Sequence, residues 1–194
     1  MRIKNSNETP ELDMNPMVDM AFLLVSFFML TTTFKTVEPV TVDKPSSTSN
    51  IKVPERNIMK ITVDEQGAVY FGIDNKFTRQ ALIKKMALIN DLEFSEDEIS
   101  AFGLISGMGV SLAELSNFLS LPTEEQKLYK QTGIPCMDER NELREWILTT
   151  RLINPNHRIS ILADRDTPYE YIRCVINTLQ DLRIYRFNLV TDLE

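Results

Sequence analysis

An apolar stretch near the N-terminus constrains this chain more than any other feature of its sequence. It runs from Met17 to Phe34, and Asp19 is its only charged residue. At about 1.5 Å of rise per residue, a helix of this length spans about 27 Å, close to the roughly 30 Å thickness of a bilayer core. The sequence therefore predicts a transmembrane helix over residues 16–34.

Two other interpretations of the stretch are a cleaved signal peptide and the core helix of a soluble domain. Three features disfavour a signal peptide: acidic residues dilute the basic N-terminal region, Asp19 interrupts the apolar run, and no small-residue cleavage motif follows. Basic residues flank the stretch in equal number, Arg2 and Lys4 before it and Lys35 and Lys44 after it. Charge therefore does not orient the helix across the membrane.

The start of the helix is predicted at Asn15 and Pro16, because Asn is a favoured N-cap and Pro loses no hydrogen bond at the first helical position. Asp19 then falls in the first turn. There the helix N-terminus favours its carboxylate by about 0.3–1 kcal/mol, whereas hydrocarbon disfavours it by about 2.5–3.5 kcal/mol. Desolvation is the larger effect, so we expect Asp19 to take up a proton readily, as a proton carrier must.

A polar stripe along the helix accompanies this acid. Asp19, Ser26 and Thr33 are spaced by seven residues, and each step of seven turns only about 20° around the helix. Such a stripe is expected to face protein or water. In a second interpretation Asp19 only caps the helix in the headgroup region, and Ser26 and Thr33 are small residues of a packing seam. The pattern is compatible with both, although acids within a membrane are functional hypotheses by default.

A Val-rich strap and a polar linker follow the helix over residues 35–57. Val37, Val40 and Val42 predict an extended strap or an edge strand, because the proline among them cannot donate to a sheet ladder. The Pro- and Ser-rich residues 44–54 predict a flexible tether. The strap is either a docking segment for a partner or a passive spacer.

Residues 58–194 are predicted to form a small α+β domain, with a mixed sheet and helices on one face. We expect strands at 58–63, 68–71, 158–162 and 183–190 from their apolar patterns. Helices are expected from about Thr78 to 89, from 138 to 152, and from the Thr167-Pro168 cap signature to 182.

An acidic insertion interrupts this domain at about residues 91–135. It contains eight acids and two bases, which sum to −6 of the chain's net charge of −7. Short helices are expected to begin after Ser95, Ser111 and Pro122. The acidity argues against nucleic-acid binding and favours a packed helical subdomain or an acidic partner surface.

No enzyme signature is present, and the sequence predicts no cofactor and no metal site. His157 is the only histidine and is expected in a solvated turn. Asp164 and Asp166, which suggest catalytic carboxylates, are more typical of a loop between a strand and a helix. Cys136 and Cys174 are the only cysteines, which leaves the redox compartment open.

These residues carry a resemblance to a known family. The run Asp13-Met14-Asn15-Pro16-Met17-Val18-Asp19, followed by an apolar helix and a Val-rich strap, resembles the ExbD/TolR family of bacterial biopolymer-transport proteins. The pattern of 159–170 and 187–190 does so too. The resemblance covers roughly residues 11–90 and 141–192, and the acidic insertion does not belong to the compact family pattern.

The resemblance implies a cytoplasmic segment at residues 1–15, one span in the bacterial inner membrane and a periplasmic domain at 58–194. It implies a dimer inside a ring of ExbB/TolQ-like subunits that uses the proton motive force to energise a TonB- or TolA-like protein. Asp19 would be the coupling acid, and Val37 to Val42 a docking segment for the energised partner. Periplasmic placement would also allow a Cys136–Cys174 disulfide.

An alternative function is a passive, membrane-tethered module whose soluble domain and insertion recruit a periplasmic partner. A TolR-like role in envelope maintenance is a further alternative within the family. The contacts expected in every case are with membrane lipid and with other proteins, and none with nucleic acid.

Overall fold

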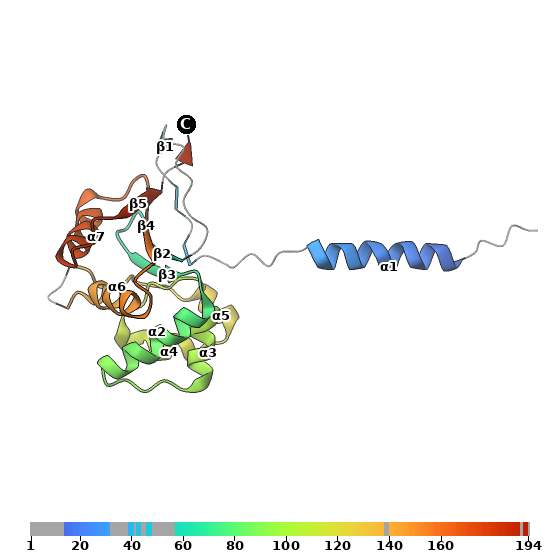
Figure 1. The fold of residues 1–194 in the computed structure, drawn as a ribbon, viewed down its shortest axis with the longest axis horizontal. Coiled ribbons are helices and arrows are strands. Elements are labelled where there is room, and N and C mark those ends of the chain that lie inside the picture. The colour runs from blue at the N-terminus through green and yellow to red at the C-terminus, as the bar shows by residue number, and fades with distance from the viewer. Residues whose placement is uncertain are drawn as a thin grey trace, which may run out of the picture. The chain divides into compact units, whose positions relative to one another are not determined.

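The computed structural model describes residues 14–31, 39–40, 42–43, 46–47, 57–137, 140–190 and 192–193. The chain divides into two units, Met1–Lys35 and Thr36–Glu194. The first contains helix α1, and the second contains a folded domain with a mixed sheet and several helices (Figure 1).

Helix α1 spans Met14–Thr31, and none of its residues is buried. Among the described residues it is the one helix long and apolar enough to cross a membrane. Its large apolar side chains are 55–88% exposed, whereas a core helix of a soluble domain would be buried. An apolar surface of this extent requires lipid or other helices to cover it.

The start of α1 differs from the prediction. The helix begins at Met14, so Asn15 lies inside it and is not the N-cap. Pro16 remains in the first turn, where its missing N–H costs nothing. Asp19 therefore lies in the second turn rather than the first.

The domain is built on a four-stranded sheet with the order β3-β2-β4-β5. Its strands are β2 (Ile58–Val63), β3 (Val69–Ile73), β4 (Arg158–Ala163) and β5 (Phe187–Val190). β2 is antiparallel to β3 and parallel to β4, and β4 is parallel to β5. The sheet is thus mixed, as the sequence predicts.

The side chains of β2 alternate between the two faces of the sheet and show which face forms the core. Met59, Ile61 and Val63 belong to one buried apolar cluster, whereas Lys60 and Thr62 point to the other face. The cluster includes side chains from α2 (Lys76–Ile89), α6 (Glu142–Ile153) and α7 (Tyr169–Asp181). These three helices therefore cover the same face of the sheet, which confirms the predicted α+β fold.

Two predicted helix caps are wrong. Asn75, not Thr78, caps α2, because its side chain accepts from the backbone N–H groups of Phe77 and Thr78. Helix α7 begins at Tyr169, and Thr167 instead donates its hydroxyl to the carbonyl of Asp64 at 3.0 Å.

The last strand is also shorter than expected. It begins at Phe187 instead of residue 183, because Arg183 has a φ of 56° and Ile184 N–H bonds back to the carbonyl of Leu179. A residue with a left-handed φ, followed by this hydrogen bond, ends helix α7, so the strand begins a few residues further along the chain.

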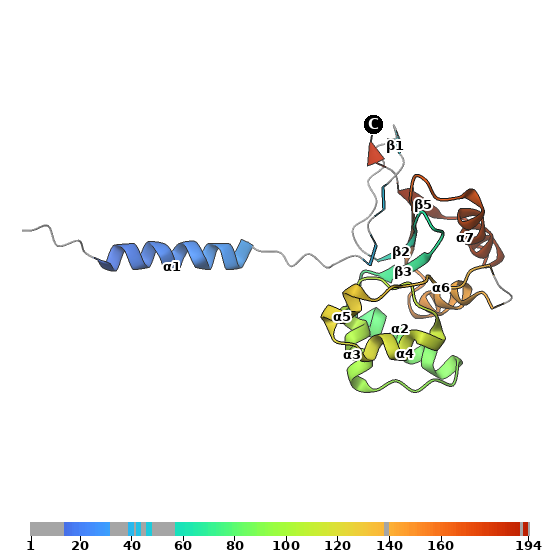
Figure 2. The same ribbon diagram turned by 180° about the vertical axis from the view of Figure 1, so that it is seen from behind.

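The acidic insertion forms the three predicted short helices, α3 (Glu96–Leu104), α4 (Leu112–Ser120) and α5 (Thr123–Leu128). Figure 2 shows them beside α2 and below the sheet. Ser95 and Glu98 form a capping box at the start of α3. Ser111 makes no such bond, and Glu142 accepts the first N–H of α4, that of Leu112, at 2.8 Å.

The insertion is part of the domain core and not a separate subdomain. Phe102 of α3 stacks on Trp146 of α6, with ring centroids 6.0 Å apart. Phe71 of β3 and Met108 exchange two backbone hydrogen bonds, at 2.7 and 2.9 Å, and Ile134 N–H donates to the carbonyl of Val69 at 2.8 Å. The insertion thereby covers the outer edge of β3, which protects that edge from pairing with other chains.

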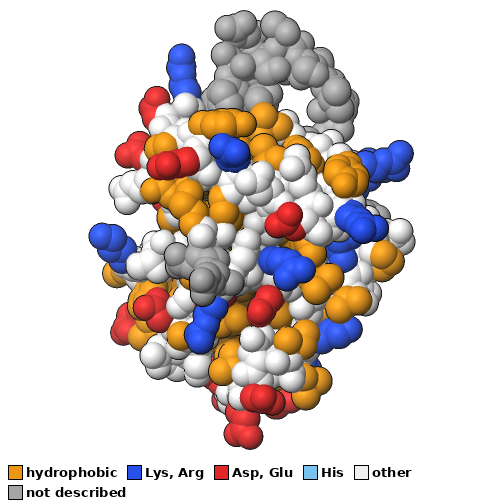
Figure 3. Space-filling model, turned by 90° about the vertical axis from the view of Figure 1, so that its left-hand side faces the viewer, with side chains coloured by type: hydrophobic (Ala, Val, Ile, Leu, Met, Phe, Trp, Pro, Cys, Tyr) orange, Lys and Arg blue, Asp and Glu red, His pale blue; other side chains and the backbone are white. Residues whose placement is uncertain are grey.

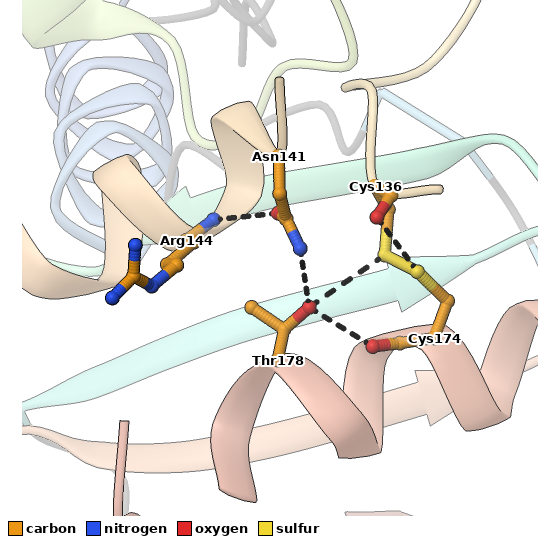
Figure 4. The surroundings of a disulfide bond; sticks show 5 residues. All are labelled: Cys136, Asn141, Arg144, Cys174 and Thr178. Carbon is orange, nitrogen blue, oxygen red and sulfur yellow. Dashed lines mark hydrogen bonds between the residues drawn. A yellow bond between two sulfur atoms is a disulfide. The ribbon is translucent and has the colours of Figure 1, made fainter. Parts of the chain in front are cut away.

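A disulfide joins Cys136, just after the insertion, to Cys174 of α7, with the Cα atoms 6.3 Å apart (Figure 4). Beside it, Asn141 accepts from Arg144 N–H as the cap of α6 and donates to the hydroxyl of Thr178 at 2.7 Å. The disulfide and this hydrogen bond fix the start of α6 to α7.

Replacing both cysteines by serine is expected to lower the free energy of unfolding by about 3–4 kcal/mol, because the disulfide closes a loop of 38 residues in the unfolded chain. Denaturant unfolding of the full chain in detergent, under oxidising and reducing conditions, measures this difference. The variant should be insensitive to reductant, and equal stability of both chains would contradict the expectation.

Candidate functional site: the membrane acid and the strap

Asp19 is the only charged residue of α1. Ser26 lies seven residues further along the same side and is the one half-buried residue of α1, the others being exposed. Thr33, the third member of the predicted stripe, lies outside the described residues. Because the N-terminal dipole acts mainly within the first turn, Asp19 in the second turn receives less help from it than the sequence suggested.

The strap lies against the folded domain in the residues that are described, Pro39, Val40, Val42 and Asp43. Asp43 N–H donates to Oδ2 of Asp164 at 2.8 Å, and its carbonyl accepts from Arg165 N–H at 2.8 Å. Oδ1 of Asp164 accepts from Asp166 N–H at 3.0 Å, which shapes the loop after β4. This loop therefore clamps the end of the strap.

The other end of the described strap lines an open pocket of about 290 Å³, which lies mainly on the sheet face opposite the helices and extends past β3 to Arg79 of α2. Pro39 and Val40 line it together with Lys60, Tyr70 and other residues of β2 and β3. A Cβ on Gly107 would lie 3.2 Å from Cγ of Pro39, so only glycine allows this approach without a shift.

The predicted partner-binding residues are thus only partly placed. Val40 and Val42 are half-buried and do not belong to a strand, and Val37 lies outside the described residues. Further along, Ser46–Ser47 (β1) pairs in parallel with Asp192–Leu193 (β6). The strap is extended along its own domain at these points and forms no long edge strand there.

Arg79 is a buried residue at this pocket that the sequence analysis did not single out. It is 9% exposed, and its Nε and Nη2 donate to the carbonyl of Gly103 at 3.2 and 2.8 Å. Burial lowers the pKa of Arg79, and the charge of Asp74 opposes this effect. The burial of Arg79 could have been predicted from its position on the apolar face of α2, one turn before Leu82 and Ile83.

Replacing Asp164 by alanine is expected to loosen the strap, because Asp43 N–H loses its acceptor. Hydrogen exchange of the Asp43 amide should become about tenfold faster or more, as expected for the loss of about 1.5 kcal/mol from a charge-assisted hydrogen bond. Asp166→Ala, in the same loop, is the matched control. An unchanged exchange rate in Asp164→Ala would contradict the inference that Asp164 holds the strap at Asp43.

His157 is buried, in contrast to the solvated turn that the sequence suggested. It is 4% exposed, and neither ring nitrogen has a hydrogen-bond partner among the described protein atoms. The reason is tertiary: Arg158 N–H bonds to the carbonyl of Asn57, which draws the preceding turn against the sheet. Burial lowers the pKa of His157, Arg151 lowers it further, and Asp74 opposes both.

This burial predicts a pH-dependent stability. A folded-state pKa below the ordinary value of 6.5 means that the unfolded chain binds the proton more readily, so stability is full above about pH 6.5 and is lost as the pH falls. The loss should not exceed about 1.4 kcal/mol per pH unit. Unfolding of the natural chain and of His157→Leu, measured from pH 7.5 to 5.5, should show the decline only in the natural chain.

Within the described part of the chain, no three His, Cys, Asp or Glu side chains are placed to hold a metal ion. Asp164 and Asp166 serve the loop after β4, in agreement with the interpretation of these acids as loop residues.

Comparison with known proteins identifies the family. Residues 5–194, a range that includes the insertion, match the family model described as "Biopolymer transport protein ExbD/TolR". The curated proteins and the solved structures gave no match to the chain. Because the family model covers nearly the whole sequence, and because a lone apolar helix precedes a small mixed α+β domain, the chain belongs to the ExbD/TolR family of biopolymer-transport proteins.

Proposed function

We propose that the chain is the proton-coupling subunit of an inner-membrane motor of the ExbB–ExbD type, in which Asp19 takes up and releases the proton. Members of the family are membrane-anchored transport subunits that generally act with ExbB/TolQ and TonB/TolA partners. In this proposal α1 forms a dimer inside a ring of ExbB/TolQ-like helices, and the domain transmits the motion to a TonB- or TolA-like protein.

The observation that carries the proposal is a single carboxylate on a helix with no apolar residue buried. In hydrocarbon the ionised form of that group costs about 2.5–3.5 kcal/mol, so an intramembrane acid persists where it has a function or a partner. The exposed apolar surface of α1 requires cover by lipid or other helices, and in this proposal Asp19 faces the helix–helix or water-filled side.

The disulfide supports a periplasmic location of the folded domain. Disulfides persist in oxidising compartments such as the periplasm and are rare in the cytosol. With Cys136 and Cys174 on the periplasmic side, residues 1–15 are cytoplasmic and α1 crosses the membrane once. The disulfide thus supports one of the two orientations that the flanking charges leave undecided.

The strap is proposed as the docking segment for the energised partner. Its described residues are held by two hydrogen bonds at Asp43 and by contacts around Pro39, rather than by a continuous ladder. Val40 and Val42 are therefore available to a competing partner at modest cost, and Val37 belongs to the proposed segment by its place in the sequence alone.

Asp19→Asn tests the proton-coupling role. The variant keeps the shape of the side chain but cannot release a proton, so proton-dependent uptake or partner energisation should fall to the level of cells that lack the chain. Assembly with the membrane partners, measured by co-purification, should be unchanged. Thr31→Ala, at a polar residue of α1 outside the stripe of Asp19, Ser26 and Thr33, is the control and should retain most activity.

Retained activity in Asp19→Asn would contradict the proposal and favour the passive tethered module. The class of partner is resolved in the same cells, because a TonB-type role affects uptake across the outer membrane and a TolA-type role affects envelope integrity.

A further inference from the structure

The insertion carries a pocket of about 380 Å³ between α3, α4 and α5, and Pro39 of the strap also lines it. Its lining is mainly apolar, and the rings of Phe118 and Tyr129 pack against each other with centroids 5.3 Å apart. The apolar residues around it include Leu104, Ile105, Phe118, Leu121, Pro122 and Tyr129.

Three polar side chains of the pocket hold the backbone of the insertion or an acid next to the pocket. Gln126 donates to the carbonyl of Leu121 at 2.9 Å, and Gln131 accepts from Gly109 N–H at 2.5 Å. Lys127 pairs with Glu124 at 2.8 Å. The pocket therefore offers apolar contact to an occupant more than free hydrogen-bonding groups.

Two leucines leave a further apolar surface open at this part of the insertion. Leu104, at the end of α3, lines the pocket and is 64% exposed, and Leu128, at the end of α5, is 86% exposed. An occupant that covers these side chains gains free energy in proportion to the apolar area removed from water.

The surroundings of the pocket are acidic. Asp97 lies one helical turn before Ala101, which lines the pocket, and Glu124 and Glu125 lie in the first turn of α5. Residues 91–135 contain eight acids and two bases, a sum of −6. On the face drawn in Figure 3, acidic side chains gather at the lower end of the domain.

We propose that this pocket docks a segment of a partner protein in which a large apolar side chain is flanked by Lys or Arg. The apolar lining selects the anchor residue, and the acidic surroundings attract the basic flanks and speed the encounter. The same acids repel anionic lipid headgroups and free phosphates. The docking does not depend on Asp19, so it is a property of the domain beyond proton coupling.

The test measures binding of short synthetic peptides to the full chain in nanodiscs of zwitterionic lipid, with empty nanodiscs as background. A labelled Lys-Lys-Leu-Phe-Lys-Lys peptide should bind, and its affinity should fall with added salt. Glu-Glu-Leu-Phe-Glu-Glu and Lys-Lys-Ser-Ser-Lys-Lys should bind at least tenfold more weakly. Fluorescence anisotropy reports all three affinities.

Substitutions then locate the site. Leu104→Ser should weaken binding of the basic apolar peptide about tenfold, as expected when one leucine contact is lost. Leu88→Ser, at a leucine of α2 that is 82% exposed and outside the pocket, should leave it unchanged. Glu125→Gln should reduce both the affinity and its salt dependence, whereas Glu65→Gln, in the β2–β3 turn, should change neither.

Absence of binding by the basic apolar peptide, equal binding of the acidic peptide, or an unaffected Leu104→Ser chain would each overturn the proposal. Asp19→Asn is expected to bind the peptide normally. An Asp19→Asn chain that binds the peptide but fails to energise transport therefore contradicts neither proposal, and loss of peptide binding alone leaves the motor role untouched.

Discussion

The domain is organised around one buried side chain, Trp146 of α6. Its ring packs against Phe71 of the sheet and Phe102 of the insertion, with centroids 6.0 Å away in each case. The sheet, the helical layer and the insertion thus share a single packing contact. In a close-packed interior such a contact determines the spacing of all three layers, because neighbouring side chains leave little room for adjustment.

The features that could be predicted from the sequence are those set by local signals, and the Trp146 contact is not among them. Periodicity identified the strands and amphipathic helices, and the composition of residues 17–34 identified α1, because those signals are local. The helix caps were less certain. Asn75 and Thr78 are both competent caps, and the choice depends on where the chain leaves the sheet: Asp74 N–H bonds to the carbonyl of Ile58 in the neighbouring strand.

The features that sequence reasoning missed are contacts between distant segments. Asp164 holds Asp43 across 121 residues, and Arg79 reaches the carbonyl of Gly103 across 24. His157 looked like a turn residue and is buried because its neighbour pairs with Asn57. In the same way, the concentrated negative charge of the insertion suggested a part distinct from the rest of the domain, yet its apolar side chains belong to the domain core. Exposed charge therefore describes the surface of a segment and not its packing partners.

The parallel pairing of β2 with β4 has a consequence for the order of folding. Ile58 lies opposite Arg158, so the central pair of the sheet joins residues 100 positions apart. Because the chain is synthesised from its N-terminus, β2 is made well before β4, and its second edge stays uncovered until β4 follows. During that interval the hairpin with β3 and the local helices α2–α5 are the contacts within reach, and contacts at short sequence separation form fastest. The insertion can then act as an intramolecular shield, which covers the apolar face of the first hairpin until the rest of the sheet arrives.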